Sequence, residues 1–308
     1  MSHYINLSAQ AEKLYRHNRQ GSYKTRERYE EAFNRFLRFV ARQHRLEKLQ
    51  NISAKHMESY FASLQKKGLA ASTLKTEASA VRFWFDKIPN TKYRLPSNVG
   101  LQLDRRKFGG VDRTWSDSEF SRMIGECWKA KRDDWEACIV IARYAGLRIH
   151  EIMRIDTAIA RAALKTGVIT IKGKGGKTRQ VPINETIRIE FEKFLKLTPM
   201  GHKLFVPGGK PTDLVTKELQ AFIRSHRESV QLPDSDETKH ITFHGLRHTY
   251  AAEQYTRLIQ AGHSEYDARK RVSELLGHNR EDVTRIYLAG VKKADSSSES
   301  GRDGSGDV

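Results

Sequence analysis

The pattern of hydrophobic and polar positions is clearest between residues 23 and 44, in the run YKTRERYEEAFNRFLRFVARQH. Phe33, Leu37 and Val40 recur at the spacing of one helical face, and arginine and lysine side chains fall on the opposite face. An amphipathic helix of this kind packs its apolar stripe against a core and leaves its basic face in solvent. The spacing therefore predicts a helix over residues 23–44.

Two further helices are predicted in the first hundred residues. Ser53 is a favourable N-cap for a helix that runs to about Lys67, and Gly68 ends it, since glycine readily takes the left-handed conformation beyond a helix end. Ser72 is the predicted cap of the next helix, which Pro89 stops because proline has no backbone N–H to donate. Three or four short helices with basic faces make a small all-α module.

The helical periodicity fails from about residue 90 to residue 113. This stretch contains proline and glycine and a cluster of three cations, Arg105, Arg106 and Lys107. A segment of this composition has neither an apolar face to bury nor the residues that favour a regular element. We therefore predict an extended linker between two domains.

A second domain is predicted to begin near residue 114, where Ser116 and Glu119 have the spacing of a capping box. Helices follow to about Asp156. Residues 167–183, GVITIKGKGGKTRQVPI, alternate as two strands around a glycine-rich turn, which predicts a hairpin. Helices are predicted to resume near Glu185, near Asp213, from His244 to about Ala261 and from Ser264 to Leu276.

These patterns predict a mainly α fold with a small β-hairpin, divided into two domains. Residues 1–108 form a helical domain, 109–113 end the linker, and 114–291 form a mixed α/β domain. The tail, residues 292–308, is rich in serine, glycine and aspartate and has almost no apolar content, so we expect it to be disordered. A chain of 308 residues is long enough for two domains with cores of their own.

The charge of the chain points to a polyanionic partner. Lysine and arginine number 55 against 37 aspartate and glutamate residues, which gives a net charge of +18. The excess is uneven, because residues 1–110 carry 22 basic and 9 acidic side chains. Nucleic acid is the simplest partner, although a ribosome-associated or merely soluble basic protein has the same composition. If nucleic acid is the partner, we expect the basic side chains of the first third of the chain to make most of the electrostatic contacts with it. Arg105, Arg106 and Lys107 are expected to contact phosphates.

Cysteine usage and hydropathy place the chain inside the cell. Cys127 and Cys138 form no CxxC motif and no disulfide framework, which fits a reducing cytoplasm. No apolar run approaches the ~20 residues needed to span a bilayer, and the N-terminus lacks the apolar core of a signal peptide. We expect a soluble, cytoplasmic, nucleoid-associated protein with no membrane partner.

Six side chains of the second domain suit chemistry on a phosphodiester. A guanidinium offers a rigid fork of donors that matches non-bridging phosphate oxygens and offsets the charge of a pentacoordinate transition state. A tyrosine phenol can attack phosphorus and keep the phosphate as an ester for a second strand. Histidine and lysine side chains can move the protons of such a step. The six are Arg148, Lys174, His244, Arg247, His278 and Tyr287.

Two motifs that suggest other chemistry fail on a required residue. His244 and His248 have the spacing of a zinc-binding HExxH helix, but Gly245 stands where that motif needs glutamate. The run 175-GGKT-178 resembles the end of a P-loop, but Ile171 stands where the first glycine is required, and a strand is predicted where a helix should follow. We therefore expect no metal, no nucleotide and no other cofactor.

In this order and spacing, the six residues resemble the tyrosine recombinase (phage integrase) family over about residues 114–291. The resemblance is carried by 146-GLRIHEI-152, 171-IKGKGGKTRQVPI-183, 244-HGLRH-248 and 274-ELLGHNREDVTRIYLAG-290. It implies a clamp of two domains around DNA, in which the N-terminal module is the core-binding domain. It also implies four protomers on two duplexes, strand exchange through a Holliday junction, and no need for metal or ATP.

The resemblance implies a role for each catalytic position. Tyr287 is the nucleophile that forms a 3′-phosphotyrosine. Arg148 and Arg247 hold the scissile phosphate and stabilise its transition state. His244 aids proton transfer from the tyrosine, and His278 bonds the phosphate.

The hairpin supplies the remaining role. Lys174 at its tip matches the lysine that acts as general acid for the leaving 5′ oxygen. Lys172 and Lys177 lie beside it in the sequence and are expected to contact DNA.

The leading hypothesis is a site-specific recombinase of a mobile element, which integrates or excises DNA. A Xer-like resolvase of replicon dimers is the alternative within the same chemistry. A type IB topoisomerase would share the phosphotyrosine, but the short chain and the motifs argue against it. A non-catalytic DNA-binding protein would require a decayed site, yet all six positions are filled. The expected partners are double-stranded recombination sites, further copies of the chain in a tetramer on DNA, and an accessory directionality factor.

Overall fold

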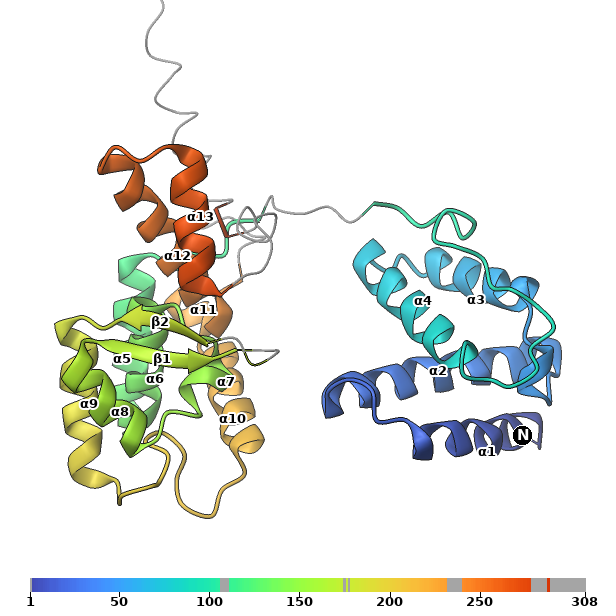
Figure 1. Ribbon diagram of the computed structural model, residues 1–308, viewed down its shortest axis with the longest axis horizontal. Coiled ribbons are helices and arrows are strands. Elements are labelled where there is room, and N and C mark those ends of the chain that lie inside the picture. The colour runs from blue at the N-terminus through green and yellow to red at the C-terminus, as the bar shows by residue number, and fades with distance from the viewer. Residues whose placement is uncertain are drawn as a thin grey trace, which may run out of the picture. The chain divides into compact units, whose positions relative to one another are not determined.

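The computed structural model of the chain is shown in Figure 1. It describes residues 2–105, 111–173, 176, 178–231, 240–277 and 287–288. The chain divides into two compact units, residues 1–107 and 108–308, and each unit has a hydrophobic core of its own. The predicted disordered tail, 292–308, lies outside the described residues.

The N-terminal unit is built from helices packed around aromatic side chains. Its elements are α1 (Ser2–His17), α2 (Tyr23–His44), the 3-10 turn η1 (Leu49–Asn51), α3 (Ala54–Lys66) and α4 (Ala71–Phe85). Helix α2 packs against α1, α3 and α4 (Figure 1). Phe33, Phe36 and Trp84 are fully buried between these helices. The apolar stripe read from residues 23–44 is therefore the side of α2 that faces the core.

A buried carboxylate joins three of these helices. Arg35 on α2 donates two hydrogen bonds to Glu77 on α4, at 3.1 and 2.8 Å, and Tyr60 on α3 donates one at 2.8 Å. A charge inside a core is tolerated when it is paired and hydrogen-bonded. The hydrogen bonds of Arg35 and Tyr60 to Glu77 therefore fix how α2, α3 and α4 pack together.

The helix boundaries predicted for α2 and α3 are confirmed, but both ends predicted for α4 are wrong, because that helix ends at Phe85 and does not run up to Pro89. Helix α2 spans residues 23–44, and Ser53 directly precedes α3, as predicted. The prediction that Ser72 is a cap is wrong, because α4 begins at Ala71 and Ala70 is its N-cap. Alanine has the highest helix propensity of the amino acids, so the helix extends back beyond the serine.

The prediction of an extended linker from residue 90 is wrong over its first part. Leu101 and Leu103 are buried in the N-terminal core. The Gln65 side chain donates a hydrogen bond to the Leu101 carbonyl at 3.2 Å, which fastens this segment to α3. Two leucines in an irregular segment make no helical or strand period, so the sequence pattern did not identify them as core residues.

The C-terminal unit is a helical domain with one small sheet in its described part. Helix α6 packs against α5, α7, α9 and α12, and the hairpin packs against α8 and α13. Its elements are α5 (Asp117–Lys129), α6 (Asp133–Ala145), α7 (Ile149–Ile152), α8 (Thr157–Thr166), β1 (Val168–Lys172), β2 (Thr178–Pro182), α9 (Glu185–Leu197), α10 (Thr212–Ser225), α11 (Arg227–Val230), α12 (Phe243–Gln260) and α13 (Glu265–Leu276).

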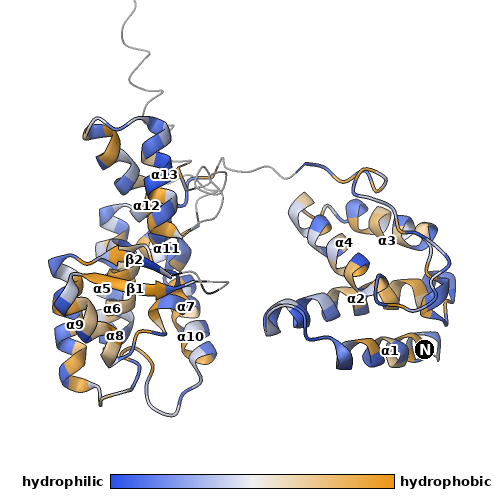
Figure 2. Cartoon of the chain, in the orientation of Figure 1, coloured by the Kyte–Doolittle hydropathy of each residue, from blue (hydrophilic) through white to orange (hydrophobic). Residues whose placement is uncertain are grey.

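The predicted hairpin is present. Strands β1 and β2 pair antiparallel, with Val168 opposite Pro182 and Lys172 opposite Thr178. Figure 2 shows β1 as a largely hydrophobic strand, and its Ile169 and Ile171 side chains are buried. The mainly α fold class with a small two-stranded sheet is therefore confirmed. None of the helices in the described part of the chain is both long enough and apolar enough to cross a bilayer.

The prediction for the second domain missed helix α8. Asp156 caps this helix by accepting a hydrogen bond from the Ile159 N–H at 2.8 Å, and Gly167 ends it with a φ of +78°. Both residues are recognisable helix signals. The sequence does carry an apolar face here, because Ala160 and Ala163 are buried and Ile159 and Leu164 pack against the same core at helical spacing.

Candidate active site

The first turn of α12 is held tightly against the segment that enters the C-terminal unit. Thr242 caps the helix by accepting a hydrogen bond from the Gly245 N–H, and its carbonyl accepts one from the Trp115 indole at 3.0 Å. A Cβ atom placed on Gly245 would lie 2.5 Å from the Arg113 carbonyl oxygen and 2.6 Å from the indole nitrogen. Glycine is therefore needed here for close packing, which positions the HGLRH segment.

Arg247 is fully buried and joins two distant parts of the chain. Its guanidinium donates to the Gly146 carbonyl at 2.6 Å and to the Leu276 carbonyl at the end of α13. Burial and the nearby charge of Arg148 lower the pKa of Arg247 to about 10, against the opposite effects of Tyr287 and Glu151. The side chain therefore stays positive at neutral pH, fixed in a site with little water.

Arg148 lies between Gly146 and α7, and its own helix holds it. The Glu151 carboxylate accepts hydrogen bonds from the Arg148 backbone N–H at 2.8 Å and from its guanidinium at 3.1 Å. The Arg148 side chain is 30% exposed, whereas that of Glu151 is 1% exposed. Arg148 is thus anchored at one side and open to solvent at the other, which leaves donors available to an anion.

Arg179 on β2 extends this network to the end of α13. It donates two hydrogen bonds to the Glu151 carboxylate, at 2.9 and 2.7 Å, and one to the Leu275 carbonyl at 3.0 Å. Burial alone would raise the pKa of Glu151, but hydrogen bonds from Arg179 and Arg148 lower it to about 2. The carboxylate is therefore charged throughout the physiological pH range, and it keeps both arginines in place.

Sequence reasoning did not single out Arg179, although the segment that contains it was part of the resemblance. An arginine at a strand position flanked by polar residues looks like an ordinary exposed side chain. Only the structure shows the close approach of Arg179 to Gly277, which follows α13 with a φ of +66°. A Cβ atom there would lie 2.9 Å from the Arg179 Cδ atom.

Tyr287 lies against the first two turns of α12. Its hydroxyl oxygen is 3.1 Å from Nε2 of His244, and its ring stacks on that of His248 with centroids 4.2 Å apart. The Arg247 guanidinium carbon is 5.8 Å from the centre of the same ring. The tyrosine is 6% exposed, so its phenol is held among one arginine and two histidines.

His244 is uncharged at neutral pH in this environment. Loss of hydration around the ring lowers its pKa to about 4, and the positive charges of Arg247, Arg148 and Arg113 act in the same direction. A neutral imidazole has one nitrogen free to accept a proton. His244 can therefore take the phenolic proton of Tyr287 across the 3.1 Å contact.

The structure thus brings together four of the six predicted catalytic residues. Tyr287 contacts His244 and Arg247, and Arg148 is close enough for its charge to lower the pKa of both His244 and Arg247. Lys174 and His278 lie outside the described residues, and so do three of the predicted DNA contacts, Arg106, Lys107 and Lys177. The other two predicted contacts, Arg105 and Lys172, are exposed side chains. Across the parts of the chain that are described, no group of three or more histidine, cysteine, aspartate or glutamate side chains could hold a metal ion.

The chain matches known protein families over both units. Residues 116–293 match the phage integrase family, and residues 4–92 match the phage integrase N-terminal family. The chain is 25% identical to tyrosine recombinase XerC of Rhizobium meliloti over 285 residues, which cover 89% of this chain and 85% of the relative. It is 26% identical to tyrosine recombinase XerD of Caulobacter vibrioides over 253 residues, which cover 78% and 77%.

Two solved structures share the fold of this chain. One is the XerH site-specific recombinase bound to a palindromic difH substrate, with a TM-score of 0.63, 19% identity, and coverage of 95% of this chain and 84% of that chain. The other is a lambda integrase dimer bound to a COC′ core site, with a TM-score of 0.63, 17% identity, and coverage of 100% and 99%. The fold is that of two-domain integrases.

Proposed function

Because this chain belongs to the phage integrase family, we propose that it is a site-specific DNA recombinase that cuts and rejoins DNA through a 3′-phosphotyrosine. One observation carries the proposal: the Tyr287 hydroxyl lies 3.1 Å from the neutral His244 ring, beside the buried positive charge of Arg247. The arrangement supplies a nucleophile, an acceptor for its proton and a cation for the phosphate in one place.

The chemical step follows from these contacts. The Tyr287 oxygen attacks the scissile phosphorus and gives its proton to His244, while the bond from phosphorus to the 5′ oxygen breaks. Arg148 and Arg247 donate hydrogen bonds to the non-bridging oxygens, where negative charge builds up in the transition state. Energy of the broken ester is kept in the phosphotyrosine, so a second strand can reverse the step without an external energy source.

Two roles are carried over from the sequence resemblance. Lys174 protonates the leaving 5′ oxygen, and His278 bonds the phosphate. Strand β1 supports the first assignment, because it ends at Lys172, two residues before Lys174. Lys172 and Lys177, with Arg105, Arg106 and Lys107, contact the DNA backbone.

The physiological reaction is integration or excision of a mobile element by a tetramer on two recombination sites, under the control of an accessory directionality factor. A Xer-like resolvase is the second candidate, and relatives named tyrosine recombinase XerC and XerD are consistent with the recombinase chemistry that both candidates share. A supercoiled plasmid with two directly repeated sites separates the two. Resolution into two circles in the absence of any partner protein supports the resolvase, whereas efficient joining of sites on separate molecules supports the integrase.

A nicked duplex tests the central claim. The duplex carries a binding site selected from random DNA by the full chain, with a nick that lets the cleaved end diffuse away. We expect the wild-type chain to form an adduct that survives denaturation, and we expect Tyr287→Phe to form none, because it loses only the phenolic oxygen.

Tyr266→Phe is the matched control, since Tyr266 is an exposed tyrosine of α13. It should form the adduct at the wild-type rate. An adduct with Tyr287→Phe would show that another tyrosine is the nucleophile. Tight binding without an adduct in the wild-type chain would favour the non-catalytic alternative.

A further inference from the structure

His248 is a buried histidine of α12 to which the proposed chemical step gives no task. It directly follows Arg247 and lies one helical turn after His244, so the two histidines project from the same side of the helix. Their rings meet edge to face, with centroids 5.3 Å apart and an angle of 82° between the ring planes. His248 is therefore packed against a reacting group although it is not one itself.

The two histidines contact Tyr287 in different ways. The planes of the His248 and Tyr287 rings are 28° apart, so the imidazole covers a face of the phenol ring, with centroids 4.2 Å apart. His244 meets the same ring at an angle of 65° and lies 3.1 Å from its hydroxyl oxygen. A contact at the hydroxyl alone leaves the ring free to turn, whereas a contact over its face fixes the plane of the ring.

Tyr287 needs such a contact because it reaches α12 from a distant segment of the chain. Its neighbour Leu288 is buried in a core cluster with Ala251 of α12 and Val272 of α13, which anchors the backbone at this point. That anchor does not set the direction of the tyrosine side chain. A nucleophile reacts fast only when its attacking atom is held in the right geometry, and displacements of about 1 Å can cost about a hundredfold in rate.

We propose that His248 is a positioning residue for Tyr287, whose ring it holds so that the hydroxyl meets Nε2 of His244. The inference rests on the proposed function and adds to it a residue that contacts neither the phosphate nor the transferred proton. The task requires a flat ring, because stacked aromatic side chains attract one another through their faces. It does not require an imidazole nitrogen.

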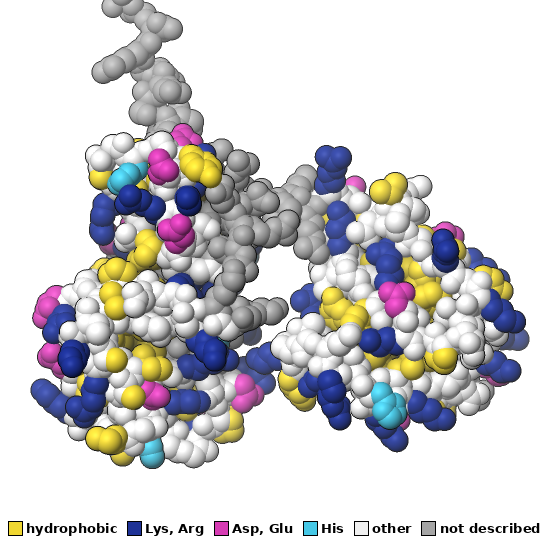
Figure 3. Space-filling model, in the orientation of Figure 1, with side chains coloured by type: hydrophobic (Ala, Val, Ile, Leu, Met, Phe, Trp, Pro, Cys, Tyr) yellow, Lys and Arg dark blue, Asp and Glu magenta, His cyan; other side chains and the backbone are white. Residues whose placement is uncertain are grey.

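Two substitutions separate the ring of His248 from its nitrogen atoms. His248→Phe keeps a flat ring, whereas His248→Leu fills a similar volume without one. Adduct formation is measured with the full chain at saturating nicked duplex. We expect His248→Leu to slow it by about threefold to tenfold, the effect of losing one aromatic pair, and His248→Phe to react at close to the wild-type rate. Affinity for the duplex should stay unchanged in both, because the many surface lysine and arginine side chains of each unit in Figure 3 are untouched.

Phe194→Leu is the control for a general loss of stability. It removes a buried ring of α9 from the other core cluster of the same unit, where Phe194 packs edge-on against Phe205 with centroids 5.1 Å apart. At a temperature where all variants are folded, this control should react at the wild-type rate. Equal slowing in Phe194→Leu and His248→Leu overturns the proposal, and so does wild-type kinetics in His248→Leu. Equal slowing in His248→Phe and His248→Leu also overturns it, because the nitrogen atoms would then be what matters.

A measurement on the full chain without DNA tests the stack directly. The tyrosine rings are labelled with ¹³C, and the NMR signal of Tyr287 is identified by its absence in Tyr287→Phe. A ring that lies against an aromatic face is shielded, so we expect the signal to move downfield in His248→Leu and to stay shielded in His248→Phe. A wild-type chain that forms no adduct but shows the shielded signal contradicts the proposed function. A chain that forms the adduct, with an unmoved Tyr287 signal in His248→Leu, contradicts only this inference.

Discussion

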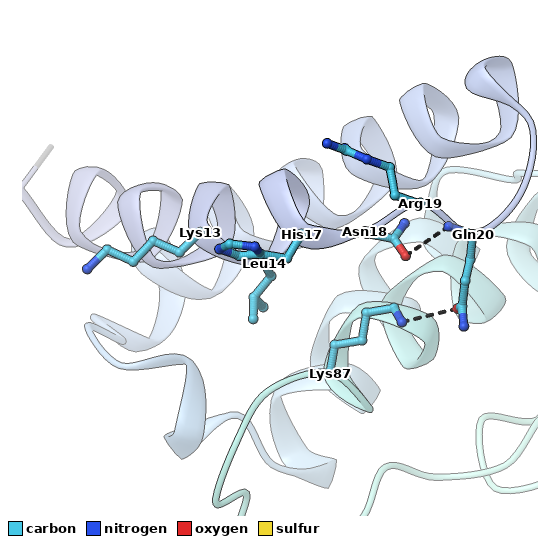
Figure 4. Close-up of a pocket in the computed structure, with 7 residues that line it drawn as sticks. All are labelled: Lys13, Leu14, His17, Asn18, Arg19, Gln20 and Lys87. Carbon is cyan, nitrogen blue, oxygen red and sulfur yellow. Dashed lines mark hydrogen bonds between the residues drawn. The ribbon is translucent and has the colours of Figure 1, made fainter.

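The exposed cations near the end of α1 and the arginine network of the C-terminal unit use positive charge in different ways. Near the end of α1, the side chains of Lys13 and Arg19 are exposed (Figure 4). In the network, Arg247 is buried and the Arg179 side chain is only 10% exposed, and each donates hydrogen bonds to a carboxylate or to backbone carbonyls. Exposed charge attracts an anion from a distance, whereas buried and bonded charge holds it in one geometry.

We therefore expect exposed arginines and buried, hydrogen-bonded arginines to respond differently to substitution. An exposed cation that acts through charge can be exchanged for another cation at little cost. A buried guanidinium acts through the positions of its several donors, which lysine cannot reproduce. Four predictions test this contrast.

The largest effect is expected at Arg247. Arg247→Lys keeps the charge but loses the fork that bonds the Gly146 and Leu276 carbonyls. We expect adduct formation at saturating DNA to slow on the order of a hundredfold, as when a preorganised donor to a transition state is removed. Arg19→Lys makes the same substitution at an exposed arginine just after α1 and should leave this rate unchanged. Equal rates for the two variants would remove the distinction between the two regions.

Arg179 is expected to act as a positioning residue. Arg179→Ala leaves the buried Glu151 carboxylate with Arg148 alone, so we expect the free energy of unfolding to fall by about 3 kcal/mol. Arg269→Ala, which breaks the exposed pair with Glu265 on α13, should cost less than about 1 kcal/mol. With Arg179→Lys, at a temperature where it is folded, adduct formation should slow while DNA affinity stays unchanged. Wild-type kinetics in that variant would make the role of Arg179 purely structural.

The Glu151 carboxylate predicts a pH dependence of stability. Its pKa in the folded state is about 2, below the ordinary value of 4.5, so its contribution is full above pH 4.5 and is lost as pH falls toward 2. The difference in free energy of unfolding between the wild type and Glu151→Gln should narrow by about 2 kcal/mol from about pH 5.5 to about pH 3. The same comparison for Glu265→Gln, at an exposed glutamate, should be nearly flat. A constant difference for Glu151→Gln would mean that its charge is not stabilised by the network.

The smallest effect is expected at Gly245. In Gly245→Ala the new methyl group meets the Arg113 carbonyl oxygen, which is backbone and cannot move aside freely. We expect a loss of about 1 kcal/mol or more in the free energy of unfolding, measured in denaturant. Gly125→Ala in α5 has no atom within 4 Å of the new group and should stabilise the helix by about 0.5–1 kcal/mol. If both variants were stabilised, close packing at the start of α12 would not be what requires glycine.

Local sequence signals determined most of the elements. Helix α2 has an apolar stripe of six buried residues between Ala32 and Ala41. The capping box of Ser116 and Glu119 opens α5 with hydrogen bonds of 2.7 and 3.2 Å. The hairpin alternates with the period of a half-buried strand. These features lie within a few residues of one another, so they can be read without knowledge of the fold.

Features that depend on distant partners could not be read in this way. Leu101 and Leu103 are core residues because α3 lies next to them. In the sequence, His248 could be interpreted only as half of a zinc motif that lacks its glutamate. Its structural partner is Tyr287, 39 positions away, on which its ring stacks. Nothing in the sequence next to His248 or next to Tyr287 indicates that their rings stack on each other.

The two-part helical plan, the basic character of the first third, and the residue types that hold and attack a phosphodiester can all be read from the sequence. Which charges are buried, and which groups they hydrogen-bond to, follows only from how the chain packs. Arg247 is indistinguishable in sequence from an exposed arginine, yet it bonds carbonyls 101 and 29 positions away. Burial and pairing are properties of the packed chain, because they arise where segments far apart in the sequence exclude water from a shared contact.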